Sequence, residues 1–466
     1  MLSRRLFLSS AAALAVAGAG TAFAKTGPLF GFDPAQLLGR TRRAQDPEEA
    51  PLDPQVRASR IAWLEQHTHE LDSIDLDDNE FDDLEAFGKA VGDARIVMLG
   101  EQLHGDGTTF RAKARLVRFL HEEMGFDVLA FESGLYDMHK VWERIRAGKD
   151  ARKAVRHGLL RPWSFSRQMQ PLFDYVGERA QSRRPLELAG FDCQFTSDRR
   201  DSLFDDLSAF LAAQGVDTAS VGDWPRFCAV LDKIADQSTH SQWKPSQEER
   251  DLVLSTIDAL AGCIASAQGA ETAFWRQLFK STKAQTELRF GADPESSGNV
   301  RDAAMADNLI WLAREAFARR KIIVWAATSH NIRNPHLIEI GNPDPSYATR
   351  TTMGHLVWQA FGAAAYNVGF TAYEGSVGWA NNDLGWFPSG PITLPPPSPD
   401  SLEGLWGETR HDNAFLDLRR LPAGGDWLKT PLVSRPSGYV PELADWSQVL
   451  DAMVFTRTMR PSTSAE

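Results

Sequence analysis

Four polar side chains follow runs of apolar residues, at positions where buried strands are expected to end. They are Glu101, His104, Glu132 and His330. A histidine with carboxylate neighbours can have its tautomer fixed and its basicity raised, which suits a general base that activates water. In an open α/β sheet the carboxyl ends of the strands face one crevice, so residues far apart in the sequence can converge there. The four residue types therefore point to a water-activating site.

Each of these residues also has a purely structural interpretation. Glu101 lies between an expected strand and an expected helix and could cap the helix, and His104 could be a hydrogen-bonded loop residue. Glu132 could pair with a surface arginine, and His330 taken alone is more often structural than catalytic. The occurrence of all four residues at only three strand ends favours a shared site.

A metal centre is the main chemical alternative. Glu101 and His104 are three residues apart, and with Glu132 and His330 they could supply a set of His and carboxylate ligands. The strict H-E-x-x-H pattern of zinc hydrolases is absent, which favours a site without a metal. We therefore expect no cofactor and keep a divalent cation as the alternative.

Motifs for other chemistries are missing from the sequence. The chain has no G-x-S-x-G elbow, no G-x-G-x-x-G fingerprint and no P-loop. Its 3 cysteines lie in no recognisable nucleophile motif, and an odd, sparse set cannot form a disulfide framework or a CxxC metal site. Covalent catalysis by serine or cysteine is therefore not supported.

Six short apolar runs are expected to form a central sheet. They cover residues 95–100, 128–132, 186–191, 321–326, 366–371 and 451–455. Residues 108–124 have the spacing of an amphipathic helix that stops at Gly125. Strand, helix and strand in close succession indicate a parallel βαβ unit. We therefore predict an α/β fold with a central mixed, partly parallel sheet and helices on both faces.

The residues between the third and fourth strands carry no strand signal. Helices are expected at 198–213, 225–238, 246–267, 270–288 and 298–318. We interpret residues 198–300 as a helical insertion that forms a lid over the cleft, because structureless loops of that length are uncommon in compact domains. The α/β catalytic core is expected over residues 54–197 and 301–456, followed by a tail over 457–466.

The composition excludes several classes of protein. The 466 residues are 43% hydrophobic and 24% charged, which rules out a collagen, a coiled coil and a wholly disordered chain. The net charge of -12 would repel phosphate backbones, so no nucleic-acid partner is expected. No stretch after residue 24 is long and apolar enough for a membrane helix, so no membrane insertion of the mature form is expected.

One segment resembles the signature of a known family. The sequence LGEQLHGDGTTFRAKARLVRFLHEEMGFDVLAFES, residues 99–133, is similar to that of the erythromycin esterase family. In that family a strand ends in G-E-x-x-H-G, a helix with a basic residue follows, and the next strand ends in Glu. Weaker matches extend the resemblance over about residues 55–456. The resemblance implies a hydrolase, related to macrolide-resistance enzymes, that cleaves an ester or lactone bond of a small molecule.

The resemblance also implies roles for the four residues named above. His104 matches the histidine that the family uses as the base that activates water. Glu101 and Glu132 match the family's two glutamates, and we expect both to hold and polarise His104. His330 would bind the carbonyl oxygen or a substrate hydroxyl as negative charge develops.

Two further residues receive roles from the same comparison, and Ser133 is assigned beside them. Arg301 matches the arginine of an R-D block and would act on the carbonyl oxygen or a substrate hydroxyl. Lys113 falls at the basic position of the helix, where it would fix a carboxylate by an ion pair. We assign Lys113 and Ser133 to substrate binding. Lys113 and Arg301, if near the site, would also repel a metal cation.

The chain departs from the family at one position. Many members carry A-H-N-x-H after the strand that matches residues 322–325, whereas this chain reads Ala326-Ala327-Thr328-Ser329-His330. Ala327 removes a polar contact and weakens any claim that macrolides are substrates. It also supports one alternative function, an exported binding protein without turnover; a metal-dependent hydrolase is the other.

The first residues read as an export signal. Residues 1–24 contain Arg4 and Arg5, then an apolar run, then Ala22 and Ala24 at the positions that a signal peptidase reads. The paired arginines resemble a twin-arginine signal, with an ordinary secretory signal as the alternative. Residues 25–53 are expected to be a disordered leader. The mature protein is therefore expected in the periplasm or outside the cell.

Export can be tested by cell fractionation. We expect mature protein that starts near Lys25 outside the cytoplasm. Changing Arg4 and Arg5 to lysine should retain the precursor inside the cell if the twin-arginine route is used. Full-length wild-type protein confined to the cytosol would contradict export by either route.

Overall fold

The computed structural model describes residues 51–197, 201–236, 243–291, 294–339, 348–379 and 390–465. The expected signal peptide, residues 1–24, lies outside the described residues, and so does the leader up to residue 50. The described chain begins just before helix α3 (Pro54–His67), where the Asp53 side chain accepts hydrogen bonds from the first backbone N–H groups.

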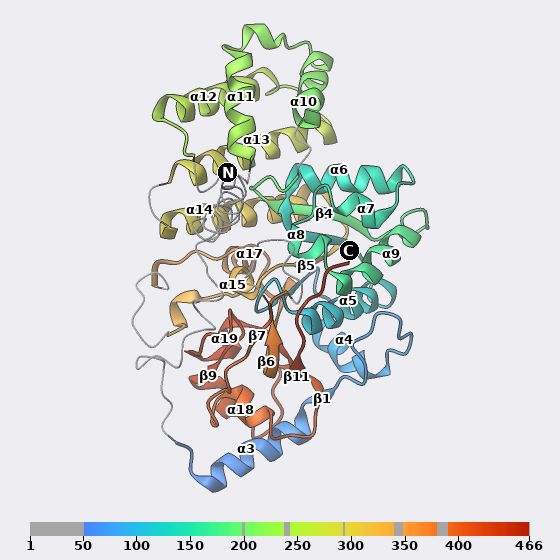
Figure 1. Ribbon diagram of the computed structural model, residues 1–466, viewed down its shortest axis with the longest axis vertical. Coiled ribbons are helices and arrows are strands. Elements are labelled where there is room, and N and C mark those ends of the chain that lie inside the picture. Colours follow the sequence, from blue (N-terminus) through green and yellow to red (C-terminus); the bar gives the residue numbers. More distant parts are fainter. Residues whose placement is uncertain are drawn as a thin grey trace, which may run out of the picture.

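A nine-stranded mixed sheet forms the centre of the molecule (Figure 1). The strand order is β1 (His69–Glu70), β8 (Asn413–Asp417), β11 (Ala452–Met459), β6 (Ala365–Val377), β2 (Ile96–Leu99), β5 (Lys321–Trp325), β3 (Phe126–Gly134) and β4 (Glu187–Asp192), with β7 (Ile392–Thr393) paired to β6. The six expected strands form one continuous parallel block from β11 to β4. The prediction of a mixed, partly parallel sheet is therefore confirmed.

The strands that the sequence did not reveal are short or antiparallel. β8 pairs with β11 and β1 at one edge of the sheet, and both pairings are antiparallel. β9 (Leu432–Ser434) and β10 (Glu442–Ala444) form a separate antiparallel pair. β1, β9 and β10 span only two or three residues, too few to show a periodicity.

The parallel strands are buried on both faces, which explains why they read as continuous apolar runs. Val97 and Leu99 of β2 point to one hydrophobic cluster, whereas Ile96 and Met98 point to another. The first cluster includes α5 (Gly107–Glu122) and α9 (Gln170–Arg179). The second includes α14 (Pro294–Trp311) and α17 (Met353–Phe361). Helices thus cover both faces of the sheet, as predicted.

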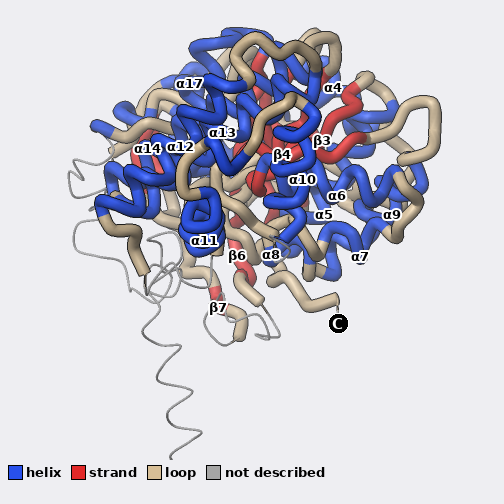
Figure 2. The backbone as a smooth tube through the Cα atoms, turned by 90° about the horizontal axis from the view of Figure 1, so that it is seen from above, coloured by secondary structure: helices blue, strands red, loops and turns tan. Residues whose placement is uncertain are grey.

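Further helices complete the α/β part. They are α4 (Glu85–Val91), α6 (Leu135–Arg146), α7 (Ala151–Val155), α8 (Arg161–Ser164), α15 (Thr328–Asn331), α18 (Leu402–Trp406) and α19 (Trp446–Val449). Figure 2 shows helices around the strands on several sides. None of the described helices combines the length and the apolar character that crossing a lipid bilayer requires.

The helices expected between the third and fourth strands are present. α10 (Asp201–Ala213), α11 (Trp224–Ala235), α12 (Gln247–Cys263) and α13 (Ala270–Phe290) gather at one end of the molecule (Figure 1). α13 packs along α14, which in turn contacts β4, so the helical group rests on the sheet through α14. Whether residues 198–300 act as a lid stays a prediction.

The C-terminal residues differ from the expected tail. β11 continues to Met459, which is buried, and residues 461, 462 and 464 make isolated bridges to other parts of the chain. The C-terminus lies beside α8 (Figure 1). β11 therefore stays in the sheet beyond residue 456, because it runs parallel to β6 as far as the pair of Met459 with Gly375.

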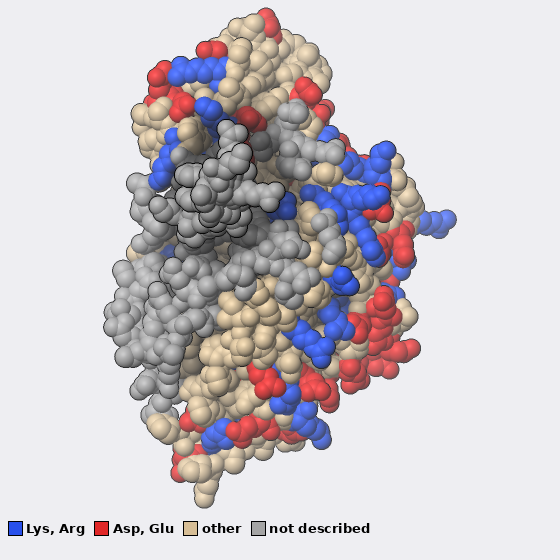
Figure 3. Space-filling model, in the orientation of Figure 1, with Lys and Arg blue, Asp and Glu red and all other residues tan. Residues whose placement is uncertain are grey.

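The negative net charge is unevenly distributed. Residues 135–184, which span α6 to α9, contain 12 Lys or Arg and 5 Asp or Glu. Basic side chains are accordingly prominent over α6 and α7 in Figure 3. The molecule thus carries a basic region on an otherwise acidic surface.

Two glycine variants test the close packing of the strands that lead to the site. A Cβ at Gly190 in β4 would lie 2.4 Å from the Gly134 carbonyl oxygen, whereas nothing lies within 4 Å of a Cβ at Gly262 in α12. Gly190→Ala should lower the free energy of unfolding by about 1–3 kcal/mol, since backbone must move. Gly262→Ala should leave it unchanged or raise it slightly. Denaturant unfolding of both variants measures this difference. Equal stability of the two variants would contradict the close packing of β4 against β3.

Candidate active site

The order of three strands creates the candidate site. β5 lies between β2 and β3, and all three run parallel. The residues at their carboxyl ends therefore meet at one edge of the sheet. Glu101 follows β2, Glu132 lies near the end of β3, and His330 lies in α15 just after β5.

Glu101 is the centre of a first group of side chains. Its carboxylate is fully buried and accepts three hydrogen bonds, each 2.8 Å long. His104 Nδ1 and Trp163 Nε1 both donate to Oε1, and Lys113 Nζ donates to Oε2. The three donors come from the loop after β2, from α8 and from α5, so one carboxylate holds three elements together.

The position of His104 determines its tautomer. Because Nδ1–H donates to Glu101, a neutral ring carries its free lone pair on Nε2. No group of the described residues hydrogen-bonds Nε2, and the side chain is 19% exposed. The Trp163 ring stands edge-on to the imidazole, with 5.0 Å between the ring centroids. The imidazole is therefore oriented on one side and open on the other.

Lys113 is a buried cation behind Glu101. Its ammonium group pairs with Glu101 and lies 4.0 Å from the centre of the Trp325 ring. Burial lowers the pKa of Lys113 to about 8, although Glu101 opposes this shift. The expected ion pair with a carboxylate is present. The substrate-binding role stays a prediction, since the side chain is fully buried.

Arg301 of α14 organises a second group. Its Nη2 donates to Glu132 Oε1 over 2.8 Å, and its Nε lies 3.1 Å from Asp192 Oδ2. Burial disfavours the charge, but Asp192 and Glu132 raise the pKa of Arg301 further above its usual range. Glu132 accepts a second hydrogen bond, 3.0 Å long, from the Ala327 backbone N–H. Arg301 thus fixes two strand ends against α14.

His330 completes the second group. Its Nδ1 donates to Asp302 Oδ1 over 2.9 Å, and its Nε2 lies 3.3 Å from Glu132 Oε1 and 3.1 Å from Arg301 Nη1. Burial favours the neutral ring, but Asp302 and Glu132 together raise the pKa of His330 to about 9. His330 and Arg301 in turn hold the pKa of Glu132 well below its usual range, against the effect of burial. The carboxylates on either side of His330 therefore favour its protonated form.

The two groups are neighbours, but one expected contact differs. We expected Glu101 and Glu132 to hold His104 together, whereas only Glu101 hydrogen-bonds it. Glu132 instead contacts Arg301, His330 and the Ala327 amide, because β5 and α14 bring these groups closer. His104 still affects Glu132 through space, since it lowers the pKa of that carboxyl.

Ser133 lies behind the site. Its side chain is fully buried, and its hydroxyl oxygen accepts a 3.0 Å hydrogen bond from the Leu160 backbone N–H. This bond anchors the chain just before α8, which carries Trp163. The substrate-binding role of Ser133 stays a prediction.

Three residues of the site were missed from the sequence. Asp192 and Asp302 lie in segments that match the family, but no role was assigned to them. Trp163 had no signal, because its indole N–H reaches Glu101 only after α8 folds back over the site. Long-range hydrogen bonds of this kind have no sequence periodicity.

The arrangement does not resemble a metal centre. Among the described residues, no group of three or more His, Cys, Asp or Glu is placed to hold a metal ion. The carboxylates of Glu101 and Glu132 face Lys113 and Arg301 instead. The ligand set that the sequence allowed is therefore not assembled in this part of the chain.

Comparison with known sequences connects the chain to one group of proteins. A family model described as erythromycin esterase matches residues 121–459, which include Glu132, Arg301 and His330 but begin after His104. The YbfO protein of Bacillus subtilis (strain 168), a hydrolase by name, is 26% identical over 431 residues, covering 86% of this chain and 91% of its own. Erythromycin esterase type II of Escherichia coli is 21% identical over 373 residues, covering 74% of this chain and 85% of its own.

Solved structures share the fold. A Bacillus cereus protein superimposes with a TM-score of 0.73 at 20% identity, covering 89% of this chain and all of its own. A variant of the erythromycin esterase EreC in its open conformation gives a TM-score of 0.63 at 18% identity, covering 84% of this chain and 98% of its own. At these identities the likeness concerns the fold.

The charge on His330 predicts a pH-dependent stability. The folded pKa of about 9 lies above the ordinary 6.5, so the stabilisation is complete below pH 6.5 and is lost as the pH rises toward 9. Lys113, with a pKa near 8 against 10.5, acts in the opposite direction only above about pH 8. Between pH 6.5 and 8 the free energy of unfolding should fall by about 1–1.5 kcal/mol.

The measurement is denaturant unfolding over this pH range. His330→Gln should remove most of the slope between pH 6.5 and 8, because the amide does not titrate. A variant that keeps the full wild-type slope would show that another group is responsible.

Proposed function

The chain belongs to the erythromycin esterase family, and from this membership and the geometry around His104 we propose that it hydrolyses a carboxylic ester or a lactone with water activated by His104. The family and the name of the YbfO relative support hydrolysis in general. The proposal goes further in two respects: the bond cleaved is an ester or a lactone, and His104 is the base.

The observation that carries the proposal is the asymmetry of the His104 ring. Nδ1–H is held by the buried Glu101, while Nε2 has no partner among the described residues and the side chain is 19% exposed. A water molecule can donate a hydrogen bond to Nε2, transfer its proton there and attack the carbonyl carbon through its oxygen. Glu101 stabilises the imidazolium that forms, since it lies 2.8 Å from Nδ1.

The second group can stabilise the developing negative charge. Arg301 and protonated His330 lie side by side, and their high pKa values keep both charged at neutral pH. A carbonyl oxygen placed against these cations would be stabilised as it becomes an oxyanion. Collapse of the tetrahedral intermediate breaks the ester C–O bond, and the proton on His104 passes to the leaving alkoxide.

The substrate is expected to be a small molecule with an ester or lactone. The names of the E. coli and EreC proteins refer to erythromycin, which is a statement about those proteins. In this chain Ala327 stands where many family members have histidine, and its side chain offers no polar contact. We therefore propose the bond type and leave the alcohol portion to a substrate panel. The proposed mechanism uses no metal.

Replacement of His104 tests the proposal. His104→Ala should lower kcat by about 10²–10⁴ on any cleaved ester, the usual share of general base catalysis. His67→Ala, which removes a histidine from the last turn of α3, is the matched control and should leave kcat unchanged. Equal activity of the two variants would exclude His104 as the base.

The same assay separates the alternatives. Enzyme quenched during turnover should carry no covalent adduct, and an acyl group on Ser133 or Ser329 would replace water activation with covalent catalysis. Loss of activity on chelation, restored by one divalent metal, would favour a metal-dependent hydrolase. If no ester or lactone of the panel is cleaved, the result would favour a binding protein.

A further inference from the structure

The last residues of the chain contact the two loops that meet at Glu101. We propose that residues 460–465, here called the C-terminal strap, position His104 and Trp163 for catalysis, and that Ser462 is the central positioning residue. This inference rests on the proposed function, because it assumes that His104 is the base. The strap begins just after residue 459, where the family match ends.

The backbone of the strap holds the His104 loop. Ser462 N–H donates to the carbonyl oxygen of Gly105, the residue after His104, over 2.8 Å. The same N–H lies 3.0 Å from the carbonyl oxygen of Gly378. Arg460 and Thr108 exchange two further bonds: Thr108 N–H donates to Arg460 O, and Arg460 N–H donates to Thr108 Oγ1. The loop is thus bonded to the strap on both sides of Asp106.

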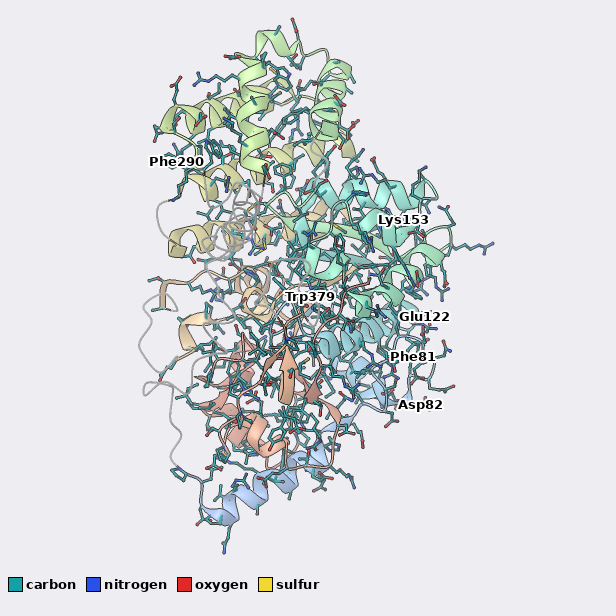
Figure 4. All side chains as sticks on the ribbon, viewed as in Figure 1. Phe81, Asp82, Glu122, Lys153, Phe290 and Trp379 are labelled. Carbon is teal, nitrogen blue, oxygen red and sulfur yellow. The ribbon has the colours of Figure 1, made fainter. Side chains whose placement is uncertain are left out.

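The fit between the loop and the strap is close. A Cβ at Gly107 would lie 2.7 Å from the Pro461 carbonyl oxygen, so only glycine allows the approach. On the other side of the loop, a Cβ at Gly105 would lie 2.7 Å from the Cα of Gly378. Trp379, labelled near the middle of Figure 4, forms a bridge to Ser462 and is buried. The His104 loop therefore has little freedom to shift while the strap is in place.

The side chain of Ser462 reaches the segment that carries Trp163. Its Oγ lies 2.8 Å from the Ser166 Oγ, and both serines are fully buried. Ser166 N–H in turn donates to the Trp163 carbonyl oxygen. Further along the strap, Thr463 O accepts from Arg167 N–H over 2.8 Å and Ala465 N–H donates to Phe165 O over 2.9 Å.

Ser462 therefore bonds to both loops whose side chains share one oxygen. His104 Nδ1 and Trp163 Nε1 both donate to Glu101 Oε1, while Ser462 bonds the Gly105 carbonyl oxygen through its N–H and the Ser166 hydroxyl through its own hydroxyl. A shift of either loop would change the angle of the imidazole, and small displacements of a catalytic group are costly in rate. The strap itself has no group at the reacting atoms, so its role is positioning.

Truncation and point variants test the strap in the full-length background. A chain that ends at Met459 should lose about 100-fold in kcat, and Ser462→Ala about 10-fold, with KM changed by less than about 2-fold. Ser166→Ala should resemble Ser462→Ala, and the double variant should be little worse than either, because the two hydroxyls bond each other and share Gln168 Oε1 as a further acceptor. Additive losses would contradict a shared bond.

Ser401→Ala is the matched control. Ser401 is also a buried serine, and its hydroxyl caps α18 by accepting from Gly404 N–H. Its replacement should lower Tm to a similar extent as Ser462→Ala and leave kcat unchanged. If kcat falls equally in both variants, the effect of Ser462 is general destabilisation and the proposal fails.

Hydrogen exchange provides a readout that needs no turnover. In the chain that ends at Met459, and more weakly in Ser462→Ala, the amides of Thr108 and Arg167 should exchange faster, while those of β3 stay protected. Unchanged exchange at both amides would contradict the positioning role of the strap, even if the activity falls. If the full chain cleaves no ester, the proposed function fails, and this measurement still decides whether the strap holds the two loops.

Discussion

The buried carboxylate of Glu101 is the interaction on which the rest of the site depends. A fully desolvated charge is costly unless it is paired and hydrogen-bonded, and Glu101 meets this condition with three donors at 2.8 Å. The donors belong to elements that pack on one face of the sheet. Loss of any donor would leave the carboxylate partly unsatisfied, so its requirement for partners constrains how α5, α8 and the loop after β2 can pack.

In the second group the buried charge that needs partners is a cation. Arg301 is the buried cation, and Glu132 and Asp192 supply the negative charge. His330 adds a second cation between Glu132 and Asp302. Alternating charges of this kind stabilise each other while the neighbouring His104 keeps one nitrogen free. The site is therefore highly charged internally, although each charge has its partner.

Close approach of backbone segments restricts where the elements of this site can lie. Gly105 and Gly107 lie where a side chain would collide with Gly378 and Pro461, and Gly190 lies against the end of β3. The contacts of Gly105 and Gly107 bring together parts of the chain that are separated by hundreds of residues. Glycines at such crossings allow hydrogen bonds between backbone segments. These backbone contacts in turn position the charged side chains of the site.

The local sequence determined the strands and the candidate site residues, and the tertiary structure decided their partners. Parallel strands buried on both faces are continuous apolar runs, so all six could be predicted, and the polar residues at their ends identified His104 and Glu101. The pairing of Glu132 with Arg301 rather than His104, the contact of Trp163 with Glu101 and the packing of the C-terminal residues were not predictable. Each depends on which elements become neighbours in the sheet and above it, and hydrogen bonds across such distances leave no periodic pattern in the sequence.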